Sequence, residues 1–229
     1  VSRGARIFEQ TRALEIVPGD KPIVRTERGR VTAKHVVLAG NAYMGKLIPK
    51  LSARVLPSAS SVIATEPLSE ALADKLLPGD VAVCDPRTAL DYFRLSSDRR
   101  MLFGGLSNYT GMEPKNLVSV MRKKMRNVFP DLEGIKVDYA WSGWIGIGIN
   151  RMPQLGKLAP NIRYIQAYSG HGVAPTHIMA KITAESIASE TTRFDTMASI
   201  PHLPFPGGRV LGRPLLAAGM AYYKLLDLF

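Results

Sequence analysis

One stretch of the sequence combines a short apolar run with closely spaced glycines and a proline, a pattern suited to holding a ligand. Residues 164–177 read Tyr-Ile-Gln-Ala-Tyr-Ser-Gly-His-Gly-Val-Ala-Pro-Thr-His. The apolar run predicts a buried strand, Gly170 and Gly172 permit a tight turn with positive φ, and Pro175 suits the first turn of a helix. A helix that begins there directs free N–H groups and a positive dipole end above the strand, which favours an anionic or electron-rich ligand atom. The alternative is an ordinary strand–turn–helix connection.

The same segment resembles a known family. The run from Ser169 to Pro175 is similar to the C-terminal flavin-binding segment of the D-amino-acid oxidase superfamily, and within it to the gamma-glutamylputrescine oxidase group. Three more stretches resemble the family in the same order: a β-meander at 11–33, a strand leading to the flavin at 36–43, and the return from the substrate domain at 141–156. The resemblance implies an FAD cofactor that lies against seven residues: Gly40, Ser169, Gly170, His171, Gly172, Val173 and Ala174.

The resemblance also implies a reaction, the oxidation of a C–N bond in a small amine or amino acid by hydride transfer to flavin N5. Candidates to line the amine pocket are aromatic, although such side chains are also common in cores: Tyr92, Phe93, Trp141 and Trp144. Several oxidases of the superfamily carry a lysine near flavin N5. No lysine occurs between Asp85 and Pro114. The sequence therefore does not decide whether oxygen or another molecule accepts the electrons from the reduced flavin. The catalytic residues and the particular amine are not predicted.

The family's N-terminal βαβ unit has no counterpart in these residues. No Gly-x-Gly-x-x-Gly motif opens the chain after a strand, and the run 143–148 has the wrong spacing and opens no helix. We therefore expect a C-terminal part of a longer protein, without the ADP half of the cofactor site and inactive when isolated. The competing hypothesis is a cofactor-free binding or structural module that retains the fold.

The sequence predicts a mixed α/β (α+β) fold in three blocks. Residues 1–53 and 145–229 are expected to form parts of the FAD-binding domain, and residues 54–144 an antiparallel-sheet substrate domain. Alternation and turn residues predict strands at 5–8, 11–17, 23–26, 30–33, 36–39, 55–65, 81–84, 90–95, 101–104, 137–144 and 164–168. Helical spacing and caps predict helices at 44–48, 69–76, 115–129, 174–189 and 215–229.

Composition limits the other functional classes. The net charge of +11 suggests nucleic-acid binding as a possible function. The basic run at 122–126 argues against it, because it lies opposite an apolar helix face and has no interleaved aromatic residues. The four histidines show no metal-ligand spacing. The single cysteine, Cys84, excludes an internal disulfide and is expected to be a small hydrophobe in its strand. No apolar run reaches membrane-spanning length, and a single cysteine suits a reducing compartment, so we expect a cytoplasmic protein.

Overall fold

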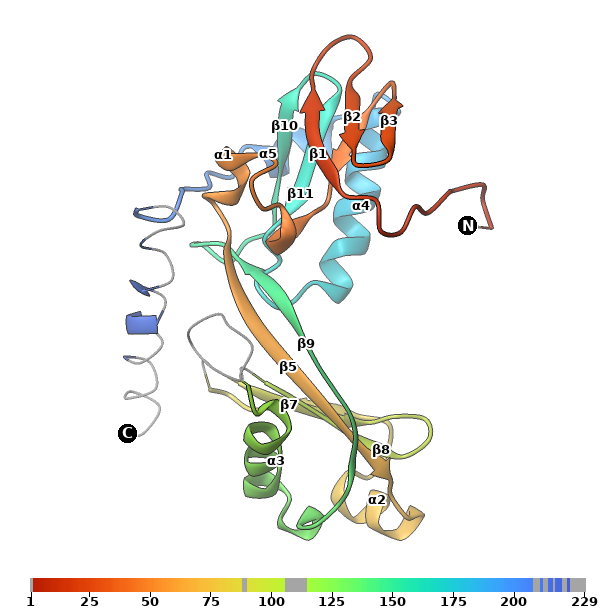
Figure 1. The fold of residues 1–229 in the computed structure, drawn as a ribbon, viewed down its shortest axis with the longest axis vertical. Coiled ribbons are helices and arrows are strands. Elements are labelled where there is room, and N and C mark those ends of the chain that lie inside the picture. The colour runs from red at the N-terminus through yellow and green to blue at the C-terminus, as the bar shows by residue number, and fades with distance from the viewer. Residues whose placement is uncertain are drawn as a thin grey trace. The chain divides into compact units, whose positions relative to one another are not determined.

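The computed structural model describes residues 2–87, 90–105 and 115–207, together with 211, 214, 215, 217–219 and 222. The chain forms two compact units (Figure 1). Unit 1 comprises residues 1–56 and 146–205, and unit 2 comprises 57–145 and 206–229. Strand β5 (Leu56–Pro67) leads from unit 1 into unit 2, and strand β9 (Val137–Ile147) returns. The predicted assignment of these parts to an FAD-binding and a substrate domain stays a prediction.

Unit 1 contains two three-stranded sheets. The first is the antiparallel meander β1 (Ala13–Val17), β2 (Ile23–Thr26) and β3 (Gly29–Thr32). The second has the order β10 (Gln154–Ala159), β11 (Ile162–Gln166) and β4 (Val36–Leu38), in which β11 is antiparallel to β10 and parallel to β4. Because β4 and β11 are parallel, their carboxyl ends meet at one edge of this sheet, where ligands of α/β proteins bind.

Short and long helices complete unit 1. They are η1 (Asn41–Tyr43), α1 (Pro49–Ser52), α4 (Val173–Ile187) and α5 (Thr192–Ala198). Helices α4 and α5 pack with the sheet through a cluster that contains Leu155, Met179 and Phe194. This packing holds the start of α4 close to the end of β11, and only six residues separate the two elements in the chain.

Unit 2 is built on a five-stranded sheet in the order β6 (Ala82–Cys84), β7 (Asp91–Leu95), β8 (Arg100–Gly105), β5 and β9. Helices α2 (Glu70–Leu76) and α3 (Leu117–Val128) and the turn η2 (Pro130–Leu132) pack against it through one apolar cluster. Met121 and Met125 of α3 are fully buried there, and each contributes about 1.5–3 kcal/mol by leaving water. Arg122, Lys123 and Arg126 lie on the outer side of α3, as predicted, whereas Lys124 is only partly exposed and pairs with the buried Asp91 of β7.

Side chains on the sheet of unit 2 alternate between two faces. Phe93 stacks on Phe103 with ring centroids 5.8 Å apart and meets Phe129 edge-on at 4.8 Å, so these rings belong to the helix-covered core. Tyr92 and Gly104, which pair with each other across β7 and β8, therefore lie on the opposite face.

Most elements agree with the prediction, and four expectations are wrong. Residues 5–8 form no strand, and Ile7 and Phe8 are exposed because no described strand pairs with them. Residues 44–48 are not helical: Gly45 takes a φ of +59°, and the next helix begins at Pro49. Cys84 is exposed, since β6 is a short edge strand.

The fourth correction concerns Gly172, whose φ is −70° rather than positive. The expected helix at 215–229 lies almost entirely outside the described residues. Within the part of the chain that the structure describes, no helix is long and apolar enough to cross a bilayer. In the same part, no three His, Cys, Asp or Glu side chains gather as metal ligands.

Candidate functional site

Left-handed backbone conformations gather where β4 and β11 end. After β4, Asn41 has a φ of +44°. After β11, Ala167, Ser169 and Gly170 have φ values of +61°, +53° and +91°. Three of these four residues are not glycine, and such residues seldom take positive φ. Strain of this kind is concentrated at binding and catalytic sites, so this edge of the sheet is our candidate site.

Hydrogen bonds between three distant segments maintain these conformations. The Asn41 side-chain oxygen accepts from the backbone N–H of Ala167 at 2.8 Å. The backbone N–H of Ser169 donates to Gly146 at 2.9 Å, and its hydroxyl accepts from the N–H of Gly148 at 3.2 Å. Gly146 must be glycine here, because an added Cβ would lie 2.3 Å from the Asn41 oxygen. The residues after β4, at the end of β9 and after β11 thus form one interlocked loop cluster.

The helix that follows this cluster begins without a side-chain cap. Gly172 is the N-cap of α4 and makes no side-chain hydrogen bond, and Pro175 has no N–H. The first intrahelical bond runs from the N–H of Thr176 to the carbonyl of Gly172 at 2.9 Å, which leaves the N–H groups of Val173 and Ala174 outside the helical ladder. The Val173 side chain is 86% exposed. The start of α4 is therefore open to an electron-rich ligand atom.

His171 and Gly172 have structural contacts within this turn. The backbone N–H of His171 donates to Tyr168 at 3.0 Å, and its ring Nδ1 lies 3.2 Å from the carbonyl oxygen of Ser169. A Cβ added to Gly172 would meet Tyr168 at an ordinary 3.5 Å. Gly170, with its positive φ, is therefore the glycine that the turn requires.

A cavity of about 430 Å³ adjoins Gly40 in unit 1. It extends along β4 and η1 toward the meander, and Arg12 and Lys46 are among its lining residues. In the described part of the chain β4 pairs only with β11, so its other edge is open beside this cavity.

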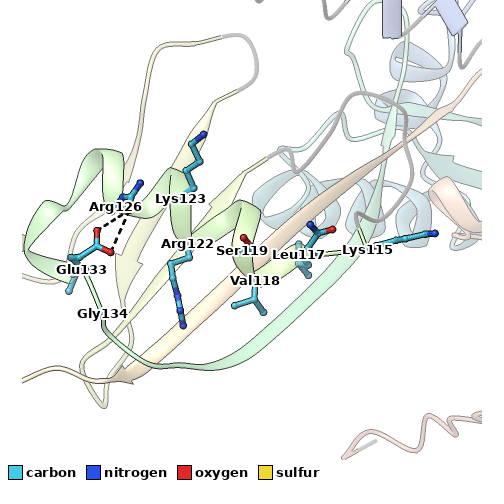
Figure 2. Close-up of a pocket in the computed structure, with 11 residues that line it drawn as sticks. Lys115, Leu117, Val118, Ser119, Arg122, Lys123, Arg126, Glu133 and Gly134 are labelled. Carbon is cyan, nitrogen blue, oxygen red and sulfur yellow. Dashed lines mark hydrogen bonds and ion pairs between the residues drawn. The ribbon is translucent and has the colours of Figure 1, made fainter.

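A larger cavity, of about 730 Å³, lies along α3 in unit 2. Figure 2 shows its lining side chains, which include Arg122 and Lys123, and the ion pair between Arg126 and Glu133 at 3.2 Å. These cations are exposed on the outer side of the helix, and a solvated basic helix face explains them without a ligand. We give this cavity no role in the candidate site.

The predicted pocket residues lie in unit 2. Tyr92 is partly exposed on β7, its ring lies directly over Gly104, and its hydroxyl is 3.1 Å from the hydroxyl of Ser60. Trp144 is partly exposed on β9, and Trp141 is exposed. Phe93 is a core residue, so it is removed from the candidates. The glycine turn and Tyr92 thus belong to different compact units.

Four residues of this arrangement were not identified from the sequence. They are Asn41, Gly146, Ser60 and Gly104. Asn41 carried a weak signal, because asparagine tolerates the left-handed region better than other non-glycine residues do. The other three depend on contacts between residues far apart in the chain, which local patterns do not encode.

The family described as DAO, FAD dependent oxidoreductase, matches residues 1–186. The chain belongs to this family. The resemblance inferred from the glycine turn is thereby confirmed, and FAD is the family's cofactor. The uncapped start of α4, at the carboxyl edge of a parallel strand pair, fits a group with electron-rich ring atoms.

Two relatives are similar to this chain over nearly its whole length. Gamma-glutamylputrescine oxidoreductase of Escherichia coli (strain K12) is 44% identical over 98% of this chain and 53% of that protein. A probable oxidoreductase, OrdL, of Haemophilus influenzae is 39% identical over 99% of this chain and 53% of that protein. The chain thus spans about half the length of these relatives.

Solved structures confirm the fold. Glycine oxidase from Geobacillus kaustophilus matches with a TM-score of 0.69 at 19% identity, over 88% of this chain and 55% of that one. L-proline dehydrogenase from P. horikoshii matches with a TM-score of 0.67 at 16% identity, over 84% of this chain and 53% of that one. The mixed α/β class with antiparallel sheets is confirmed.

Proposed function

We propose that this chain provides the flavin-ring and amine sides of an FAD-dependent amine oxidoreductase. The observation that carries the proposal is the interlocked loop cluster at the carboxyl edge of β4 and β11, followed at once by the uncapped start of α4. When bound, FAD supplies the redox chemistry by accepting a hydride from the carbon next to the amine nitrogen. The protein supplies placement and electrostatics.

Within this proposal each residue of the turn has a distinct task. The free N–H groups of Val173 and Ala174 stabilise negative charge that develops on the flavin ring, because fixed dipoles at a helix N-terminus need no rearrangement. Gly170 leaves space and takes a φ of +91° that a side chain resists. Gly40, Ser169 and His171 hold the surrounding loops through backbone conformation and hydrogen bonds.

The substrate we propose is a small amine or amino acid. The Escherichia coli relative is named for gamma-glutamylputrescine, and an amine of that kind is our first candidate. Tyr92 and Trp144 are proposed to line its pocket. Cytoplasmic location is also proposed, since one free cysteine suits a reducing compartment.

The ADP half of FAD needs partners outside these residues. The sequence contains no Gly-x-Gly-x-x-Gly turn to approach a pyrophosphate. We therefore propose that the isolated chain binds FAD weakly and does not oxidise amines.

The test compares the isolated chain with an extended protein. In the extended protein the chain is joined to the portion of the Escherichia coli relative that it does not match. We expect the extended protein to retain stoichiometric FAD and to be reduced anaerobically by gamma-glutamylputrescine or another small amine, and the isolated chain to be colourless. Bound flavin that no amine reduces would contradict the proposed reaction. Absence of flavin from both proteins would favour the cofactor-free module.

A further inference from the structure

The face of the unit 2 sheet that α2 and α3 leave uncovered, called the open face below, carries a tyrosine with a fixed orientation. Tyr92 and Gly104 form a register pair on β7 and β8, and Gly104 pairs with Val62 on β5. Ser60 is two residues from Val62, so it shares the same face. Helices α2 and α3 cover the other face (Figure 1). The Tyr92 side chain therefore lies on the face opposite the one that α2 and α3 cover.

Gly104 fixes the plane of the Tyr92 ring. A Cβ added at Gly104 would lie 2.2 Å from Cε2 and 2.3 Å from Cζ of Tyr92. Real Cβ atoms do not approach other atoms this closely, so the ring lies flat on the strand only because residue 104 has no side chain. Any larger residue must displace the ring and its hydroxyl.

Ser60 fixes the direction of the Tyr92 hydroxyl. The two hydroxyl oxygens are 3.1 Å apart, and the Ser60 hydroxyl also donates to the carbonyl oxygen of Gly105 at 3.5 Å. When Ser60 donates to Gly105, its oxygen accepts the proton of Tyr92. In that arrangement the phenolic oxygen keeps its lone pairs free for a donor from the open face.

We propose that Ser60 and Gly104 are positioning residues, which hold the Tyr92 oxygen as the acceptor for an N–H group of the amine substrate. This inference rests on the function proposed above and specifies how the pocket recognises its substrate. An ammonium presents only N–H donors to such an oxygen, and a neutral amine can turn an N–H toward it, whereas a carboxylate would face a lone pair and be repelled. The open face of unit 2 therefore binds the nitrogen end of the substrate at Tyr92.

The experiment uses the extended protein with FAD bound and measures kcat and KM for the amine, and the dissociation constant from the change in flavin absorbance. Tyr92→Phe and Ser60→Ala should each raise KM and the dissociation constant about tenfold, the effect of one lost hydrogen bond to a charged group, with a smaller change in kcat. Gly104→Ala should raise both at least as much. Ser60→Thr, which keeps the hydroxyl, should restore most of the affinity.

Ser61 supplies the matched control. It is adjacent on β5, and its hydroxyl lies 2.7 Å from that of Ser142. Ser61→Ala should lower the melting temperature and leave KM unchanged. If Ser60→Ala and Ser61→Ala have equal effects on KM while the bound flavin is still reduced by amines, this inference is overturned and the proposed function stands. A wild-type extended protein that no amine reduces would overturn both.

Discussion

Asp91 offers a sharp test of how unit 2 is held together. Its carboxylate is 3% exposed and accepts from Arg87 of the preceding loop at 2.8 Å and from Lys124 of α3. These bonds join the start of β7 to the helix that covers the sheet. Asp91→Asn keeps the volume of the side chain, removes its charge, and turns an amide N–H group toward one of the two cations.

The expected cost follows from the two charge-assisted bonds. Each is worth about 1.5–3 kcal/mol, but Arg87 is 47% and Lys124 27% exposed, so both cations regain water when the carboxylate is lost. We expect the free energy of unfolding to fall by about 2–3 kcal/mol, and the melting temperature by roughly 5–10 °C. Urea unfolding followed by circular dichroism measures the first quantity.

Asp80 is the control for this prediction. It accepts from Arg94 at 2.6 Å but is 85% exposed, so Asp80→Asn should change the free energy of unfolding by less than about 1 kcal/mol. If Asp91→Asn and Asp80→Asn cost the same, burial would not be what makes the Asp91 contacts stabilising, and the reasoning would be refuted.

Three further predictions concern charge. In the flavin-loaded extended protein, Val173→Asp should lower the flavin potential and slow its reduction by about 1–3 kcal/mol; an unchanged potential in a redox titration would show that α4 points elsewhere. Burial lowers the pKa of His202 below its usual 6.5, so as pH falls the unfolded chain takes up a proton before the folded chain does. The melting temperature should therefore fall between pH 7 and pH 5.5, and it should fall less in the His202→Gln variant. The hydrogen bond from Arg100 lowers the pKa of Asp138, so the stabilisation that the Asp138 carboxylate provides is lost as pH falls below about 4. Asp138→Asn should make the melting temperature depend less on pH in this acidic range, and an unchanged dependence would refute the assignment.

Local patterns were sufficient to predict most of the fold. The hairpin of β7 and β8, the caps of α2 and the glycine turn before α4 each depend on residues within a few positions of one another. The positive φ of Gly170 followed from its place in the turn. The family resemblance then supplied the cofactor, which no spacing of residues would have identified.

The contacts that shape the candidate site are not local. The bond from Ala167 to Asn41 spans 126 residues, and the contact of Ser60 with Tyr92 spans 32. Which of two adjacent serines faces the open side of a sheet depends on strand register, and one residue of slip reverses it. Residue types alone therefore made Tyr92 a candidate pocket residue but did not indicate the partners that orient it.

Flavin retention by a Gly170 variant tests the central claim most directly. Gly170→Val places a β-branched side chain at a φ of +91°, and Gly79→Val does the same at +79° in a turn with open space around it. In the extended protein we predict similar losses of melting temperature for the two variants, but loss of bound FAD only for Gly170→Val. Full flavin retention by Gly170→Val, or equal flavin loss from both variants, would contradict a flavin site at this turn.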